Sequence, residues 1–417
     1  MISLSDLFAT FLRIGLLSFG GPAAQIALMH RVLVEERGWL SERDFLQSLS
    51  LCMLLPGPEA MQLATYAGWR LRGVAGGLIA GGLFVLPGAL VIAALVWTYV
   101  AVGDLPLVQA AFLGVKAAVI VIVLQALRGL SSNALKGARD WTIAGLSFAG
   151  IFALGLPFPI LIALAAIWGA LGAAPQAAAL VAPAPWRDTL RTVAMWSALW
   201  LVPLAALTAF APPLLAQIGW FYAWLAVISF GGAYALLAYM TQTVVSEFGW
   251  IGTAQMIDAL GLAETTPGPL ILVTQFVAML AAALQGGMGL SLAAGAVALW
   301  AMFAPCFLFI FAAAPHMERI AANPRLAGAL AGIKAAVVGV ILNLSVWFAL
   351  NVIFARLAPG PTPFDAAPLP DWTSVNAAAI ALVALAAGLG FGLRWPLAAI
   401  LTVAATGGIA LHLAGLV

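Results

Sequence analysis

The sequence predicts an all-α, polytopic integral membrane protein built from two inverted-topology repeats that contain broken or re-entrant helices. Three observations predict this fold class: the composition, the length of the apolar runs, and an internal duplication with paired helix breaks. Of the 417 residues, 64% are hydrophobic and 8% are charged, with a mean hydropathy of +1.11. Soluble proteins average about 25% charged residues. So few polar residues cannot cover so much apolar surface, which excludes a soluble protein.

The charge and motif content excludes several other classes of protein. The net charge is +2 and no basic tract is present, which excludes nucleic acid as a partner. The two cysteines, Cys52 and Cys306, lie in apolar stretches, which excludes a disulfide framework. The histidines lack metal-ligand spacing, and no protease, hydrolase or P-loop motif is present. We therefore expect no enzyme, no metal and no cofactor; the lipid bilayer is the expected surrounding, and a homodimer is compatible with the sequence.

The internal duplication is carried by two motifs that each occur twice. Ser18-Phe19-Gly20-Gly21 recurs as Ser229-Phe230-Gly231-Gly232, and Pro56-Gly57-Pro58 recurs as Pro267-Gly268-Pro269, both at an offset of 211 residues. Without gaps, 16 of the 41 positions from 18 to 58 are identical to their counterparts. Beyond a short insertion the offset becomes 218, which pairs Pro87 with Pro305 and Lys116 with Lys334. The chain is therefore a duplicated unit.

Each repeat is expected to contain two broken apolar segments followed by four spans, since runs of roughly 20 apolar residues cross a bilayer. In the first repeat, residues 1–172, the broken segments are 6–36 and 43–70 and the spans are 73–101, 105–128, 140–155 and 157–172. In the second, residues 218–417, the broken segments are 218–246 and 253–283 and the spans are 287–313, 326–355, 375–391 and 395–416. Residues 173–217 form a linker with one joining transmembrane segment near 188–211.

The distribution of basic residues predicts that the two repeats are inverted. Arg and Lys concentrate on cytoplasmic loops, which places the loop with Arg128, Lys136 and Arg139 inside. Counting onward puts its counterpart near 356–375 outside, a layout typical of secondary transporters. If all four broken segments re-enter, only Arg356 lies outside, so the charge rule favours hairpins over single crossings, with both alternatives left open.

The helix breaks are expected to line a polar, anion-binding region. A Gly-Gly or Pro-Gly-Pro in an apolar segment interrupts the helix, and the freed backbone groups cannot face lipid. Helix N-termini after a break present free amides to an anion. The alternative is that these residues only permit kinks or close packing. Gly20, Gly21, Gly57, Gly231, Gly232 and Gly268 are the candidates from the breaks.

Charged and amide side chains near the breaks complete the candidate site. Lys116 and Lys334 lie near the middle of matching spans, where an unpaired cation is costly. They could converge on a dianion; the alternatives are snorkelling or an internal pair with Glu59, Asp258 or Glu264. The candidate substrate-binding side chains are Lys116, Lys334, Glu59, Gln62, Thr266 and Gln275, and the candidate proton carriers are Glu59 and Glu264. The expected mechanism is alternating access, with one repeat rocking against the other.

These motifs resemble a known family. The run Phe-x-Arg-x-Gly-Leu-x-Ser-Phe-Gly-Gly-Pro at 11–22 is similar to the opening signature of the chromate ion transporter family, and the run at 54–68 resembles its second signature. Residues 229–232 and 263–269 look like their C-terminal counterparts, as in the long, two-domain form of the family. The resemblance implies a bacterial inner-membrane protein that exports chromate with the proton-motive force, gives chromate resistance and has sulfate as a competing anion.

Three alternatives to chromate transport stay open. Met53 stands where a polar residue is expected before Leu-Leu-Pro-Gly-Pro, so sulfate or another anion is an alternative substrate. A passive anion channel could use the same breaks without concentrating its ion. A lipid-handling membrane protein would respond to lipid rather than to oxyanions.

Overall fold

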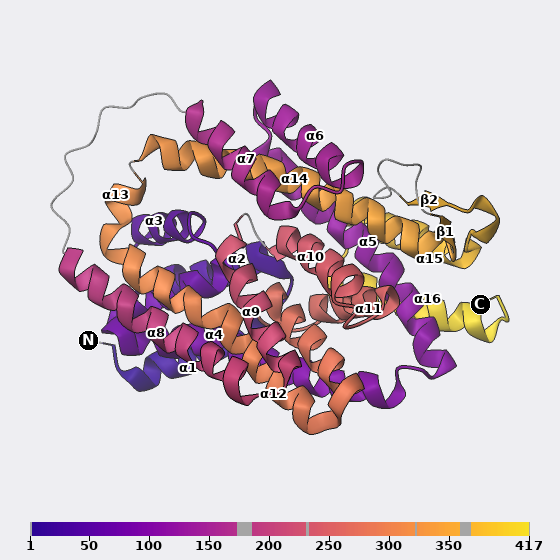
Figure 1. Cartoon of the computed structure of the whole chain (residues 1–417), viewed down its shortest axis with the longest axis horizontal. Helices are drawn as coiled ribbons and strands as arrows, with labels where there is room; N and C mark the ends of the chain where they lie inside the picture. Colours follow the sequence, from indigo (N-terminus) through magenta and orange to yellow (C-terminus); the bar gives the residue numbers. More distant parts are fainter. Residues whose placement is uncertain (1, 173–185, 231–232, 322, 359–367, 417) are drawn as a thin grey trace. The chain divides into compact units, whose positions relative to one another are not determined.

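The protein is an all-α, multi-pass membrane protein, as the composition predicts. The computed structural model describes residues 2–172, 186–230, 233–321, 323–358 and 368–416. Five helices in this part of the chain are long and apolar enough to cross a membrane, and shorter apolar helices accompany them. Figure 1 shows these helices and one pair of short antiparallel strands.

The first half contains seven helices in its described residues, with a π-helical turn, η1 (Arg31–Glu36), after the second. They are α1 (Leu4–Leu17), α2 (Gly21–His30), α3 (Glu42–Cys52), α4 (Glu59–Val102), α5 (Pro106–Ala134), α6 (Ala138–Phe152) and α7 (Phe158–Leu171). The expected breaks separate α1 from α2 and α3 from α4. Helix α4 also bends where Gly73 adopts a φ of +62°, at the expected boundary between segment 43–70 and the next span.

The second half follows the joining helix α8 (Trp186–Phe210) and repeats the same succession of elements. Its α-helices are α9 (Pro213–Ile228), α10 (Ala233–Gln242), α11 (Thr253–Glu264), α12 (Val273–Ala313), α13 (Met317–Ala321), α14 (Pro324–Ile353), α15 (Ala377–Ala387) and α16 (Leu397–Leu413). Short helical turns are η2 (Thr243–Glu247), η3 (Leu270–Leu272), η4 (Ala314–His316), η5 (Trp372–Ser374) and η6 (Gly388–Gly392). Strands β1 (Leu357–Ala358) and β2 (Leu369–Pro370) pair antiparallel inside the expected outer loop.

The broken segments consist of short helices, which confirms the expectation of broken or re-entrant helices. Helices α1, α2 and α3 have 14, 10 and 11 residues, fewer than the roughly 20 needed to span a bilayer alone. The breaks therefore leave α1, α2 and α3 individually too short to cross, whereas α4 continues past its bend at Gly73 and is long enough to span.

The chain forms two compact units, and each unit contains helices from both sequence repeats. Unit 1 comprises residues 1–97, 174–236 and 266–327, and unit 2 comprises residues 98–173, 237–265 and 328–417. The compact units thus cut across the repeats: the end of each repeat folds together with parts of the other.

Unit 2 is held together by close helix contacts that recur in matched pairs. Helix α5 packs against α15 and α16, around a buried apolar cluster that includes Val121 and Ile400 (Figure 1). At the closest approach, Gly114 lies against the Ala404 carbonyl, where a Cβ would collide with the backbone. Its repeat mate Gly332 on α14 lies in the same way against the Ala165 carbonyl of α7, where a Cβ would also collide. In each repeat, the helix that carries this glycine (α5 or α14) therefore packs against the last helices of the other repeat.

We expect Gly114→Ala to lower the stability of the protein, because the added methyl must push α5 away from the α16 backbone, at a cost of about 1–3 kcal/mol. Gly129→Ala on the same helix is the matched control. Gly129 is exposed and has open space around it, so alanine there should be neutral or stabilise by about 0.5–1 kcal/mol.

Thermal unfolding of the detergent-purified variants measures this difference. A thiol-reactive dye suits the experiment, since both Cys52 and Cys306 are free and buried and become accessible only on unfolding. Equal melting temperatures for the two variants would contradict the proposed tight α5–α16 contact.

Candidate functional site

In unit 1, each Pro-Gly-Pro break contacts the Ser-Phe-Gly-Gly break of the other repeat. The Gly57 N–H donates to the Ser229 carbonyl over 2.8 Å, and the Gly268 N–H donates to the Ser18 carbonyl, also over 2.8 Å. Position 57 corresponds to 268 and position 18 to 229, so the two hydrogen bonds are the same contact exchanged between the repeats. Each Pro-Gly-Pro break therefore satisfies a carbonyl at the Ser-Phe-Gly-Gly break of the other repeat.

The long helices α4 and α12, each of which contains a proline, also contact the breaks of the opposite repeat. Gly88, next to Pro87 of α4, lies directly against the Pro267 carbonyl, and a side chain there would collide with it. Its repeat mate Cys306 on α12 lies beside Gly57, with its Sγ 3.1 Å from where a Gly57 Cβ would stand. Both Pro-Gly-Pro breaks are thus buried against a helix of the opposite repeat, where their backbone groups are shielded from lipid.

The break glycines adopt backbone conformations that favour glycine. Gly57 has a φ of +121° and Gly268 a φ of +87°, and Gly20 and Gly21 have φ values of +84° and +80°. Gly20 is the N-cap of α2, so the first amides of that helix have no intrahelical acceptor. If Gly21 carried a Cβ, no atom of the other described residues beyond its neighbours in the chain would lie within 4 Å of it. The candidates Gly231 and Gly232 lie outside the described residues.

Three buried glutamines donate to backbone carbonyls, and two of these carbonyls belong to the breaks. Gln25 Nε2 donates to the Gly268 carbonyl over 2.7 Å, Gln62 Nε2 to the Pro56 carbonyl over 2.6 Å, and Gln275 Nε2 to the Ala89 carbonyl over 3.0 Å. Gln62 and Gln275 were candidate ligands, but the structure engages their amide nitrogens with the backbone. Gln25 was not selected from the sequence, because its repeat mate is Leu236 and no duplication marks it.

Lys116 forms a buried ion pair within unit 2. Its Nζ lies 3.1 Å from Asp258 Oδ1, and the side chains are 15% and 2% exposed. The Tyr99 hydroxyl donates to Asp258 Oδ2 over 2.9 Å. The structure therefore shows one of the alternatives considered from the sequence, an internal pair with Asp258. Lys116 comes from the first repeat and Asp258 from the second, so this contact also joins the repeats.

Lys334 holds the matching position on α14 but lacks the matching partners. Counting by the repeat offsets, Gln47 corresponds to Asp258 and Met317 to Tyr99, and neither can supply a carboxylate. Within the described parts of the chain, no ion pair to Lys334 is formed. The two lysines are therefore equivalent in position but not in charge environment.

The two candidate proton carriers belong to different units. Glu59 is half-buried and begins α4 in unit 1, where the positive end of the helix dipole favours a carboxylate. Glu264 is buried at the end of α11 in unit 2. Thr266, also buried, follows just beyond the unit boundary.

A polar cavity of about 270 Å³ in unit 2 lies beside α10 and α14. Its polar lining residues, Thr241, Gln242, Ser246 and Asn343, are all neutral. The Thr241 hydroxyl is buried and has no hydrogen-bond partner among the described residues. Such hydroxyl and amide groups can hold water or an oxyanion. Sequence reasoning did not select them, because neither a break nor a charge marks these positions.

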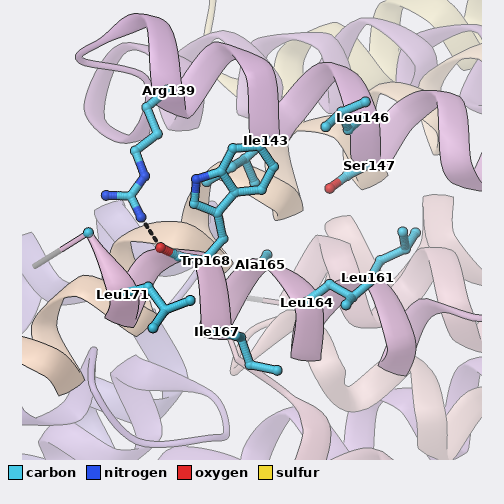
Figure 2. A pocket seen from close by; sticks show the side chains of 11 residues that line it. Arg139, Ile143, Leu146, Ser147, Leu161, Leu164, Ala165, Ile167, Trp168 and Leu171 are labelled. Atoms are coloured by element: carbon cyan, nitrogen blue, oxygen red, sulfur yellow. Dashed lines mark hydrogen bonds between the residues drawn. The ribbon is translucent and has the colours of Figure 1, made fainter.

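The larger cavity of about 840 Å³ has a different chemistry. Figure 2 shows it between α6 and α7, lined mostly by Ile, Leu and Trp side chains. Arg139 lies at one end and donates to the Trp168 carbonyl. The guanidinium thus caps the C-terminal end of α7, and the apolar walls suit hydrocarbon rather than a hydrated anion.

Comparison with known proteins gives one family. The family model described as chromate transporter matches residues 5–170 and 215–410. Chromate transport proteins of Cupriavidus metallidurans and Pseudomonas aeruginosa are 34% and 33% identical to this chain, covering 81% and 82% of it and 81% and 80% of their own lengths. A probable chromate transport protein of Synechococcus elongatus is 34% identical, covering 81% of this chain and 83% of its own. No solved structure matches.

We expect Gln25→Met to destabilise the crossed breaks by about 1–3 kcal/mol, because it removes the side-chain donor to a buried carbonyl while keeping the side-chain length. The matched control is Gln47→Met, at an exposed position on α3. The melting temperature of each purified variant measures the effect. If Gln25→Met melts with the wild type, the Gln25–Gly268 hydrogen bond does not stabilise the breaks.

Proposed function

This chain belongs to the chromate transporter family, and on that premise we propose that it carries chromate across the bacterial inner membrane as a secondary transporter. The observation that carries the proposal is the family match over both repeats, together with relatives that align along about four-fifths of the chain. The sequence repeats 1–172 and 218–417, joined through 173–217, are the proposed transport halves.

The chemistry of the site is compatible with a tetrahedral dianion. Backbone amides at helix breaks and ammonium groups bind oxyanions without a shape-specific pocket. Lys334 is the stronger candidate for direct anion contact, since Asp258 already neutralises Lys116. In unit 1, the amides after Gly20 and Gly21 are a separate candidate contact, because among the described residues no atom beyond its neighbours in the chain lies within 4 Å of where a Gly21 Cβ would stand.

We further propose that transport runs outward, is powered by the membrane-potential component of the proton-motive force and gives chromate resistance. Moving one elementary charge through a membrane potential is worth about 2.3 kcal/mol per 100 mV. A dianion leaving a cell whose interior is negative therefore gains about 4.6 kcal/mol per 100 mV. Sulfate has the same charge and tetrahedral geometry, so it is the expected competitor.

The first test is chromate uptake into everted membrane vesicles that contain the full chain, in which export from the cell appears as uptake. We expect energy-dependent accumulation that a protonophore abolishes and that excess sulfate reduces. Vesicles without the protein provide the background. Uptake that the protonophore leaves unchanged would contradict the proposed energy coupling, and sulfate uptake without chromate uptake would reassign the substrate.

We expect Lys334→Gln to reduce chromate uptake at least about tenfold, corresponding to roughly 1.4 kcal/mol of lost anion stabilisation. Lys136→Gln is the matched control, since Lys136 is exposed before α6, and it should transport like the wild type. Initial uptake rates, normalised to folded protein, make the comparison. Wild-type rates for Lys334→Gln would remove Lys334 from the anion site.

A further inference from the structure

We propose that Asp258 is the proton-binding group of the transport cycle: it releases Lys116 when it takes up a proton, so that one proton travels with each anion. This inference rests on the proposed function. It assigns the coupling to a residue other than Glu59 and Glu264, and it predicts the number of charges moved in each cycle.

The geometry joins three polar groups of unit 2, which come from three helices. Asp258 on α11 accepts from Tyr99 at the end of α4 and pairs with Lys116 on α5. Helix α11 packs directly on α5, where Gly261 lies against Val115. The carboxylate is thus held by a cation and a hydroxyl in a nearly water-free setting, with the Asp258 side chain 2% exposed.

Lys116 cannot neutralise a bound anion and an ionised Asp258 at the same time. With Asp258 ionised, the triad of Lys116, Asp258 and Tyr99 is neutral, and a dianion at Lys116 would bring its net charge to −2. A buried site disfavours uncompensated charge strongly. With Asp258 protonated, the triad carries +1, and the dianion brings it only to −1. Binding of a proton and binding of the anion therefore favour one another.

The proton balance of this step is simple. The proton comes from water on the loading side and binds a carboxylate oxygen of Asp258. Lys116 remains an ammonium and Tyr99 remains a phenol, so both keep their protons. When the anion leaves, Asp258 returns its proton to water on the other side and pairs with Lys116 again.

Few other titratable groups surround Asp258 among the described residues. On the neighbouring elements they are Lys116 of α5, Tyr99 of α4 and the exposed Asp104 in the α4–α5 turn; Glu264 lies further along α11. Because Gln47 and Met317 replace Asp258 and Tyr99 in the other half, Lys334 has no equivalent proton acceptor. The asymmetry predicts one coupled proton rather than two.

The net charge that leaves with each anion is therefore −1 rather than −2. Outward transport would still be driven by an interior-negative membrane potential, with half the electrical force that a bare dianion experiences. A pH gradient that is alkaline inside would oppose export, because the accompanying proton moves outward against it.

The test is a reversal-potential measurement with the purified full chain in liposomes, using chromate as the probe. The membrane potential is set with potassium and valinomycin, and the potential of zero net chromate flux is found with and without a pH gradient. In the wild type we expect a tenfold proton gradient to shift the reversal potential as far as a tenfold chromate gradient does. A wild-type reversal potential that ignores the pH gradient would overturn the proposal without any variant.

The Asp258→Asn variant tests whether the coupled proton binds at this residue. We expect its reversal potential to lose its dependence on the pH gradient and to shift half as far per tenfold chromate gradient. Asp188→Asn, an identical change at an exposed position on α8, should behave as the wild type. Retained pH coupling in Asp258→Asn would overturn the assignment.

Asp258→Glu covers the case in which Asp258→Asn does not fold because Lys116 is left unpaired. It keeps a carboxylate and should keep the coupling, with a wild-type response to both gradients. A folded Asp258→Glu protein that has lost pH coupling would contradict the proposal. Wild-type liposomes without chromate flux at any potential would instead overturn the proposed function, and this inference with it.

Discussion

Backbone groups freed by a helix break cannot remain unpaired inside a bilayer, and the crossed hydrogen bonds at the four breaks meet this constraint. Gly57 donates to Ser229 and Gly268 donates to Ser18, so each Pro-Gly-Pro break is hydrogen-bonded to the other repeat. The remaining architecture depends on this exchange. Gly88 and Cys306 bring the proline-containing helices over the opposite breaks, and the compact units consequently contain helices of both repeats.

A second consequence of the exchange is that small residues decide where the helices meet. Gly114 and Gly332 occupy equivalent positions, and each allows a helix to approach the carbonyl of a helix from the other repeat. Inside a membrane, helix association depends on such close packing, because lipid provides no hydrophobic driving force between apolar surfaces. The duplication is thus visible twice, in the hydrogen bonds of unit 1 and in the glycine contacts of unit 2.

Charge breaks the symmetry that the backbone preserves. The two lysines stand at equivalent positions, but in the part of the chain that the structure describes Lys116 alone forms an ion pair, with a carboxylate that also accepts from a tyrosine. In the proposed mechanism this difference has a use, since Lys334 would contact the anion directly whereas Lys116 would do so only after Asp258 takes up a proton. Glycine and proline therefore shape the scaffold equally in both repeats, whereas Asp258 and Tyr99 give them different chemistry.

By itself, the sequence determined the membrane class, the duplication and the positions of the helix breaks, because composition, apolar run length and glycine or proline chemistry act locally along the chain. It also located both lysines, since charge in an apolar span is conspicuous. Only the tertiary structure decided that the breaks cross between repeats, that Gln25 supports Gly268, and that Asp258 rather than either glutamate pairs with Lys116. These contacts join residues more than a hundred positions apart, and which partner satisfies a buried polar group depends on which helices the packing brings together.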